Sequence, residues 1–194
     1  MTTSDFYIVG IGCSSGCLNA LRVFFLNIPA DTGIAFVVVQ HLSRDYKSIL
    51  DQLLVNYSFM PIVRVTTDTE VKPNHIYLLT ENIFIKIQDN VLRVMPRKDE
   101  EVLNRAVNIF FKSLAVNSKQ KAIGVILTGM GVDGLEGVQA IDREGGIIYV
   151  QDPETTEYKQ MPTTMINENH PAGIMSPEDL AKLITDNYSD KWSR

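Results

Sequence analysis

The sequence predicts an α/β fold: a doubly wound, mostly parallel sheet with helices on both faces and a small antiparallel hairpin insert. Short apolar runs rich in β-branched residues recur along the chain, and segments with helical spacing separate them. One further stretch alternates apolar and polar residues on both sides of a short turn. Because strands buried on both faces appear as continuous apolar runs, this pattern favours a parallel sheet covered by helices.

The first half of the chain alternates predicted strands with predicted helices. Strands are expected at 6–11, 34–40, 62–65 and 76–79, where apolar and β-branched residues are dense. Between them, two sets of apolar residues recur at helical spacing: Leu18, Leu21, Phe24 and Phe25, and then Ile49, Leu50, Leu53 and Leu54. The second of these helices is expected to start near Lys47 or Ser48.

The second half begins with the predicted hairpin at 83–95, whose turn is expected at Asp89-Asn90. Strands follow at 122–128 and 146–151. Two more helical faces are Val102, Ala106, Ile109, Phe110 and Leu114, and then Leu135, Val138 and Ile141, which Gly145 and Gly146 terminate. A last helix is expected from Ser176, which has the character of an N-cap and precedes a proline.

The composition is that of an ordinary globular protein. The 194 residues are 45% hydrophobic and carry a formal net charge of −5, which suits one domain over 1–194 and excludes a disordered chain. The mild acidity argues against a nucleic-acid-binding face, and the longest apolar runs are far shorter than the roughly 18 residues of a membrane span. The N-terminus lacks a signal-peptide pattern, so a cytoplasmic location is expected.

The sequence contains two cysteines, Cys13 and Cys17, four positions apart. A structural zinc site needs four ligands, and no other cysteine or nearby histidine is available to complete one. We therefore expect two reduced structural thiols and no metal site.

Candidate chemistry lies in the loops that follow strands, where open α/β sheets place their ligands. The first loop, Gly12 to Gly16, has the pattern G-x-S-x-G between a strand and a helix, which is typical of a nucleophile elbow. Such a turn exposes the hydroxyl of Ser14 and offers backbone N–H groups to a developing oxyanion. Two alternatives stay open. One is a dinucleotide loop, although the second strand ends in Gln40-His41 and not in an acidic residue; the other is a turn that only packs a helix on the sheet.

The second and third loops supply a histidine and an aspartate. His41 follows the second strand, which is expected beside the first, so it is placed to act as general base toward Ser14. Asp133 lies in the glycine-rich loop 128–134 and is placed to orient the imidazole. Each has a structural alternative: a histidine that bonds backbone at a strand end, and an aspartate that caps the helix near Gly134.

The resulting chain order is Ser…His…Asp, which differs from the orders of α/β-hydrolases, chymotrypsin and subtilisin. This order indicates a separate solution to acyl transfer. The two remaining histidines, His75 and His170, lie in a turn and before a proline, and both are expected to be surface or structural residues.

With these residues assembled, the sequence resembles the catalytic domain of the chemotaxis receptor methylesterases of the CheB family. The similar segments span about 6–174 and include IVGIGCSSGCLNAL, PADTGIAFVVVQHLSRDYKSILDQLL, FFKSLA, AIGVILTGMGVDGLEGVQAI, VQDPETTEY and MPTTMI. PADTGIAFVVVQHL and FFKSLA are most similar to the CheB-type domain that opens CheB–CheR fusion proteins.

The resemblance implies a role for each candidate residue. Ser14 is similar to the family nucleophile, His41 to its base and Asp133 to its orienting aspartate, while Ser15 and Met130 occupy positions that line the site. The implied reaction is hydrolysis of glutamyl methyl esters on a chemoreceptor, together with deamidation of certain receptor glutamines, without cofactor or metal. The implied partners are a methyl-accepting chemotaxis receptor and a CheR-type methyltransferase domain in the same polypeptide, with no nucleic acid and no membrane insertion.

The sequence departs from the family pattern at two positions. Cys17 follows Gly16 where the family usually has a second glycine, and Asn108 stands where it commonly has aspartate. The first change is expected to crowd the helix start if that position needs a positive φ or a close approach, and the second to weaken substrate docking or an interdomain contact. We expect no receiver module before the first strand. The departures at Cys17 and Asn108 motivate a rival hypothesis, a catalytically degenerate module that binds partners within a larger sensory protein.

Overall fold

The structure is a computed structural model that describes residues 4–42, 47–98 and 103–189. In this part of the chain a seven-stranded sheet forms the centre of the molecule, and all of its strand pairs are parallel. The strands, in order across the sheet, are β10 (Gly173–Met175), β9 (Ile147–Gln151), β8 (Ala122–Ile126), β1 (Ile8–Cys13), β2 (Ala35–Gln40), β5 (Ile76–Leu79) and β3 (Ile62–Val65).

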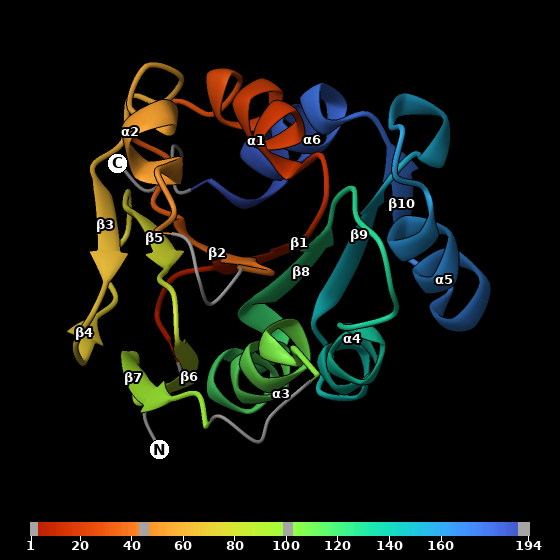
Figure 1. The fold of residues 1–194 in the computed structure, drawn as a ribbon. Coiled ribbons are helices and arrows are strands. Elements are labelled where there is room, and N and C mark those ends of the chain that lie inside the picture. The colour runs from red at the N-terminus through yellow and green to blue at the C-terminus, as the bar shows by residue number, and fades with distance from the viewer. Residues whose placement is uncertain (1–3, 43–46, 99–102, 190–194) are drawn as a thin grey trace.

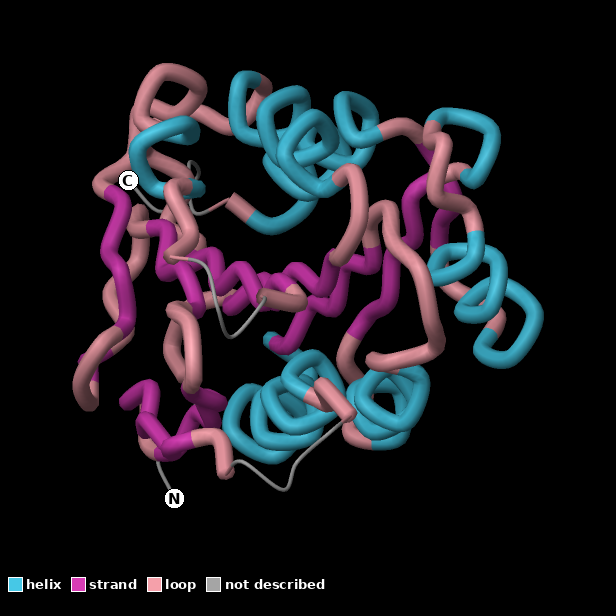
Figure 2. The backbone as a smooth tube through the Cα atoms, in the orientation of Figure 1, coloured by secondary structure: helices cyan, strands magenta, loops and turns pink. Residues whose placement is uncertain are grey.

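Helices cover both faces of this sheet (Figures 1 and 2). One face carries α1 (Cys17–Leu26), α2 (Leu50–Leu54) and α6 (Pro177–Tyr188), and the other carries α3 (Ala106–Ser118), α4 (Leu135–Arg143) and α5 (Gln160–Asn169). Short 3₁₀ turns occur at Lys119–Lys121 and Pro153–Thr155. Alternate side chains of β1 enter different cores: Val9 and Ile11 pack with α1, whereas Ile8 packs with α3. The doubly wound class is confirmed.

The antiparallel insert is also confirmed, and it is larger than expected. β6 (Ile83–Gln88) and β7 (Val91–Pro96) form the hairpin, and β4 (Thr69–Glu70) adds a third strand against β7. Asp89 and Asn90 both have positive φ, 51° and 59°, as a two-residue hairpin turn requires. The hairpin packs on α3, where the Ile87 N–H donates to Ser113 Oγ at 2.9 Å.

Several expected boundaries move by one to four residues. The first strand runs from Ile8 to Cys13, the fifth expected strand ends at Ile126, α2 begins at Leu50 and α3 begins at Ala106. Val102, expected on the face of α3, lies outside the described residues. The terminal helix begins as predicted, with Ser176 Oγ accepting from the Asp179 N–H at 3.2 Å.

Three elements, α5, β10 and β4, were not predicted from the sequence. Pro162 lies in the first turn of α5, where a proline is tolerated, and Met161 and Met165 bury the inner face of that helix. Of the helices in the described ranges, none combines the length and the apolar composition that crossing a membrane requires.

Candidate active site

The site forms where the winding of the sheet reverses. From β1 the chain passes through α1 to β2 on one side, while from β8 it passes through α4 to β9 on the other. Open α/β sheets bind ligands at the carboxyl ends of strands beside such a switch point. The carboxyl ends of β1, β2 and β8 lead directly to Ser14, to His41 and to the loop 128–134, so the topology brings all three predicted segments together.

The turn that carries Ser14 is as tight as its glycines suggested. The Ser14 N–H donates to the Thr128 carbonyl at 3.0 Å, and the Cys17 N–H donates to the Ser14 carbonyl at 3.2 Å. Gly16, the N-cap of α1, has φ 76°, and a Cβ there would lie 2.8 Å from the ring of Tyr158. Gly16 is therefore required both by its backbone conformation and by its neighbour.

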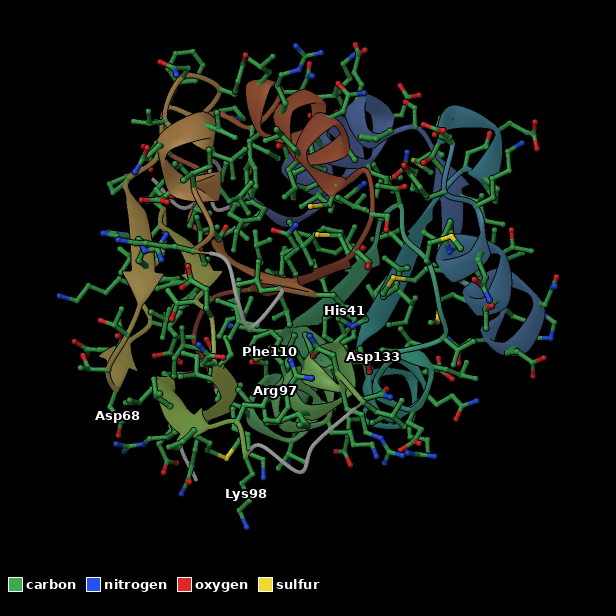
Figure 3. All side chains as sticks on the ribbon, viewed as in Figure 1. His41, Asp68, Arg97, Lys98, Phe110 and Asp133 are labelled. Atoms are coloured by element: carbon green, nitrogen blue, oxygen red, sulfur yellow. The ribbon has the colours of Figure 1, made fainter. Side chains whose placement is uncertain are left out.

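His41 and Asp133 form a hydrogen-bonded pair. His41 Nε2 lies 2.8 Å from Asp133 Oδ2, and the two side chains are 19% and 7% exposed. Figure 3 shows both residues close together between the sheet and α3. The His41 N–H also donates to the Cys13 carbonyl at 3.2 Å, which fixes the histidine beside the residue that precedes Ser14.

Asp133 does cap a helix, but not the one expected. Gly134, with φ 106°, is the N-cap of α4 and provides no side-chain hydrogen bond. The Asp133 carboxylate instead accepts the backbone N–H groups of Val107 at 2.9 Å and Asn108 at 3.1 Å, in the first turn of α3. These bonds hold the Asp133 side chain at the positive end of α3, beside His41.

A surface hollow of about 470 Å³ connects the nucleophile turn with the histidine. Its lining consists of Ser14, Ser15, Gly16, Cys17, Leu18, Asn19, Gln40 and His41. Within the described residues, no hydrogen bond joins Ser14 Oγ to the His41 ring. Because Nε2 faces Asp133, Nδ1 is the ring nitrogen that a base role toward Ser14 would use. Met130, in the loop 128–134, is 52% exposed and is not part of this lining.

The segment 156–161 supports the site, and this role was not predicted from the sequence. The Gly129 N–H donates to the Tyr158 carbonyl at 3.0 Å, the Met161 N–H donates to the Gly129 carbonyl at 3.0 Å, and the Gly131 N–H donates to Gln160 Oε1 at 3.1 Å. A Cβ on Gly129 would lie 2.8 Å from the Cβ of Ser14. The loop that carries Asp133 thus packs directly on the serine. Two of the three bonds that hold it join backbone atoms, which leave no pattern in the sequence.

Thr128 is a second feature that the sequence did not reveal. Its side chain is buried, its hydroxyl donates to the Ser15 carbonyl at 3.1 Å, and its N–H donates to Gln151 Oε1 at 2.9 Å. The first of these bonds holds the peptide that follows Ser15, and the second connects Thr128 to β9. The only available signal was a threonine at the end of a buried strand.

Both cysteines are free and buried, at 0% and 2% exposure. A hydrogen bond with Cys17 and burial raise the pKa of the Cys13 thiol well above its ordinary value, so the thiol stays protonated and is a poor nucleophile. Cys17 has the helical conformation of the first residue of α1 and packs in the core on that face. The positive φ belongs to Gly16, so the expected crowding by Cys17 does not follow.

The two other histidines lie apart from the hollow. His75 Nδ1 is 2.9 Å from the Pro73 carbonyl oxygen, and His170 is exposed at the end of α5 with φ 32°. Over the described ranges, no group of three or more histidine, cysteine, aspartate or glutamate side chains is arranged to hold a metal ion.

Comparison with known proteins agrees with this geometry. The model of the CheB methylesterase family matches residues 9–184. The chain belongs to the CheB methylesterase family. The catalytic domain of the Thermotoga maritima CheB methylesterase, known from a crystal structure, superposes on this CheB-family chain with a TM-score of 0.85 at 27% identity. The match covers 94% of this chain and 99% of that one.

Curated relatives of this CheB-family chain differ in length. A putative protein-glutamate methylesterase/protein-glutamine glutaminase of Leptospira interrogans is 27% identical over 181 residues, covering 93% of this chain and 94% of the relative. A protein-glutamate methylesterase/protein-glutamine glutaminase of Xanthomonas oryzae is 34% identical over 159 residues, covering 80% of this chain but 44% of the relative. The chain therefore spans nearly all of the first protein and less than half of the second.

Proposed function

We propose that this CheB-family chain is a serine esterase that hydrolyses glutamyl methyl esters on a chemoreceptor-type protein. The observation that carries the proposal is the His41–Asp133 pair beside the tight Ser14 turn, at the switch point of the sheet. The relatives named protein-glutamate methylesterases support the choice of substrate. In this proposal Ser14 is the nucleophile, His41 the general base and Asp133 the residue that orients it.

The first half-reaction transfers the glutamyl group to the enzyme. Ser14 Oγ attacks the ester carbonyl carbon while its proton passes to His41 Nδ1, and Asp133 stabilises the resulting imidazolium through Nε2–H. The negative charge on the carbonyl oxygen is held by backbone N–H groups, for which we propose those of Ser15 and Met130. One such donor contributes about 10²–10³ in rate. The bond to the methoxy group then breaks, and His41 returns its proton to the departing methanol.

The second half-reaction restores the enzyme. His41 removes a proton from water, the hydroxide oxygen attacks the glutamyl ester carbonyl, and Ser14 leaves with the proton from His41. The product is a glutamate carboxylate. A glutamine side chain follows the same path with ammonia as the leaving group, which matches the second activity in the relatives' names.

Two observations count against the rival hypothesis of a degenerate binding module. Cys17 occupies an ordinary helical position, and the Asn108 side chain accepts a hydrogen bond from the Gly137 N–H of α4 at 2.9 Å instead of facing the hollow. We therefore propose an active catalytic domain over 1–194. A methylated receptor is the proposed partner, while a CheR-type domain in the same polypeptide and a cytoplasmic location stay predictions.

Methanol release from a methylated chemoreceptor cytoplasmic fragment tests the proposal. The wild-type chain should release methanol, and Ser14→Ala should release none while folding normally. Release that persists in Ser14→Ala, or a folded wild-type chain that binds the fragment without releasing methanol, would contradict the proposed function.

A further inference from the structure

Asn108 connects the candidate aspartate to the helix that follows it. The Asn108 N–H donates to Asp133 Oδ1 at 3.1 Å, and its side-chain Oδ1 accepts from the Gly137 N–H at 2.9 Å. Gly137 lies in the first turn of α4, only four residues after Asp133. A single residue of α3 therefore holds both ends of the short segment 133–137.

The segment 133–137 needs this external support because its own helix cap is weak. Gly134 is the N-cap of α4, and it has no side chain to accept a hydrogen bond from the helix start. Gly137 is buried, so its N–H would lack a partner if the Asn108 amide oxygen were removed. Asn108 thus supplies from α3 the cap that α4 lacks.

The helices α3 and α4 are also packed so closely that α4 cannot shift without displacing its neighbours. A Cβ on Gly137 would lie 2.5 Å from the Cβ of Phe111, so the contact between α3 and α4 tolerates no added atoms. A shift at the start of α4 is transmitted through Gly134 to Asp133, whose contact with His41 is a 2.8 Å hydrogen bond. Displacement of a reacting group by about 1 Å can cost a hundredfold in rate.

We propose that Asn108 is a positioning residue: its amide oxygen fixes the start of α4 and thereby directs the Asp133 carboxylate at His41. This inference rests on the proposed function for its effect on rate, but its geometric part does not. An aspartate at 108 can accept the same N–H bond, and its charge suits the positive end of α4.

The experiment compares Asn108→Ala and Asn108→Asp with a matched control, Asn117→Ala. Asn117 lies on the same helix, and its Oδ1 accepts a backbone N–H from Asn90 in the hairpin at 3.1 Å, away from the site. Two quantities are measured: kcat and KM for methanol release, and the downfield proton NMR signal of the His41 imidazole N–H bonded to Asp133. The signal is assigned by its loss in His41→Gln, since the chain has three histidines.

Asn108→Ala should lower kcat roughly tenfold to a hundredfold with little change in KM, and it should broaden or remove the imidazole signal. Asn108→Asp should restore both, and Asn117→Ala should leave both unchanged at a similar loss of stability. A folded Asn108→Ala protein with wild-type kcat and an unchanged signal would overturn the inference. If no variant releases methanol but the signal still depends on Asn108 as described, the positioning role stands and the proposed function fails.

Discussion

Replacing Asp133 by asparagine removes one charge and one acceptor while it keeps the shape of the side chain. In the native protein Oδ2 accepts from His41 Nε2 at 2.8 Å and from the Val107 N–H at 2.9 Å, and Oδ1 accepts from the Asn108 N–H at 3.1 Å. An amide has a single acceptor oxygen, so its NH₂ group must face at least one of these donors. The orientation that keeps most bonds turns the NH₂ toward Asn108 and leaves a neutral oxygen for His41.

This geometry sets the expected magnitudes. In the Asp133→Asn variant the side-chain NH₂ faces the Asn108 N–H, so two donors meet at a side chain that is only 7% exposed in the native protein. This mismatch should lower the free energy of unfolding by about 1–3 kcal/mol. The imidazolium formed during catalysis loses its carboxylate partner, and the same exchange in a Ser-His-Asp protease lowers kcat about 10⁴-fold. We therefore expect Asp133→Asn to fold and to lose roughly three to four orders of magnitude in kcat.

The assay pairs methanol release from a methylated receptor fragment with urea unfolding of the same preparations. Asp68→Asn is the matched control, because the Asp68 carboxylate also accepts a backbone N–H, from Val94 at 2.9 Å, but on the hairpin insert. The control should keep wild-type kcat. A folded Asp133→Asn protein whose kcat stays within roughly tenfold of wild type would refute the reasoning, since a charge that orients the base cannot be so dispensable.

Three further predictions concern single residues. Gly16→Ala places a Cβ at φ 76° and 2.8 Å from the Tyr158 ring, so urea unfolding should show a loss of at least ~1–2 kcal/mol, and a loss within error would contradict the required turn. Cys13 should resist iodoacetamide in the native protein because its pKa is raised, and rapid stoichiometric labelling seen by mass spectrometry would argue against that burial. Burial acts to raise the pKa of Glu81, but backbone N–H groups, including that of Ser48, and Arg64 lower it below its ordinary value. Ionised Glu81 therefore stabilises the folded state at pH values above the pKa that Glu81 has in the unfolded chain. This stabilisation is lost as the pH falls through the lower pKa of Glu81 in the folded protein. Glu81→Gln should therefore make the unfolding free energy decline less steeply between about pH 5 and pH 3. An unchanged decline in this pH range would count against a stabilising Arg64–Glu81 ion pair.

The sequence predicted the fold class, and it placed Ser14, His41 and Asp133 at one edge of the sheet. In the structure His41 is hydrogen-bonded to Asp133 and lines one hollow with Ser14. Strands buried on both faces produce long apolar runs, and parallel strands bring their carboxyl ends to one edge, so residues distant in sequence could be placed together before any coordinates. The Asp89-Asn90 turn could also be predicted, because a two-residue hairpin turn needs a positive φ at both positions and aspartate and asparagine tolerate a positive φ.

Other features left no comparable pattern. β4 has two residues and β10 has three, which is too short for an alternation to register. The helix α5 was not predicted because Pro162 interrupts its sequence pattern, although a proline in the first turn does not prevent a helix. The support from Tyr158 reaches the Asp133 loop through backbone atoms, which any residue possesses.

Asn108 shows how a substitution can be misjudged without coordinates. From the sequence, the missing carboxylate suggested weaker substrate docking or a lost interdomain contact. In the fold its side chain faces the start of α4, and its backbone holds Asp133. The direction of a helical side chain depends on which neighbouring helix packs against it, and that packing is a tertiary property.

The central claim is that Ser14 is a nucleophile activated by the His41–Asp133 pair. Its most direct test is to treat the native protein with a fluorophosphonate, which reacts with base-activated serines, and to locate the adduct by tandem mass spectrometry. We expect one phosphonyl group on Ser14 of the native protein, and none on the folded His41→Gln protein. An adduct on Ser15 or Cys17, or equal labelling of Ser14 without His41, would contradict it.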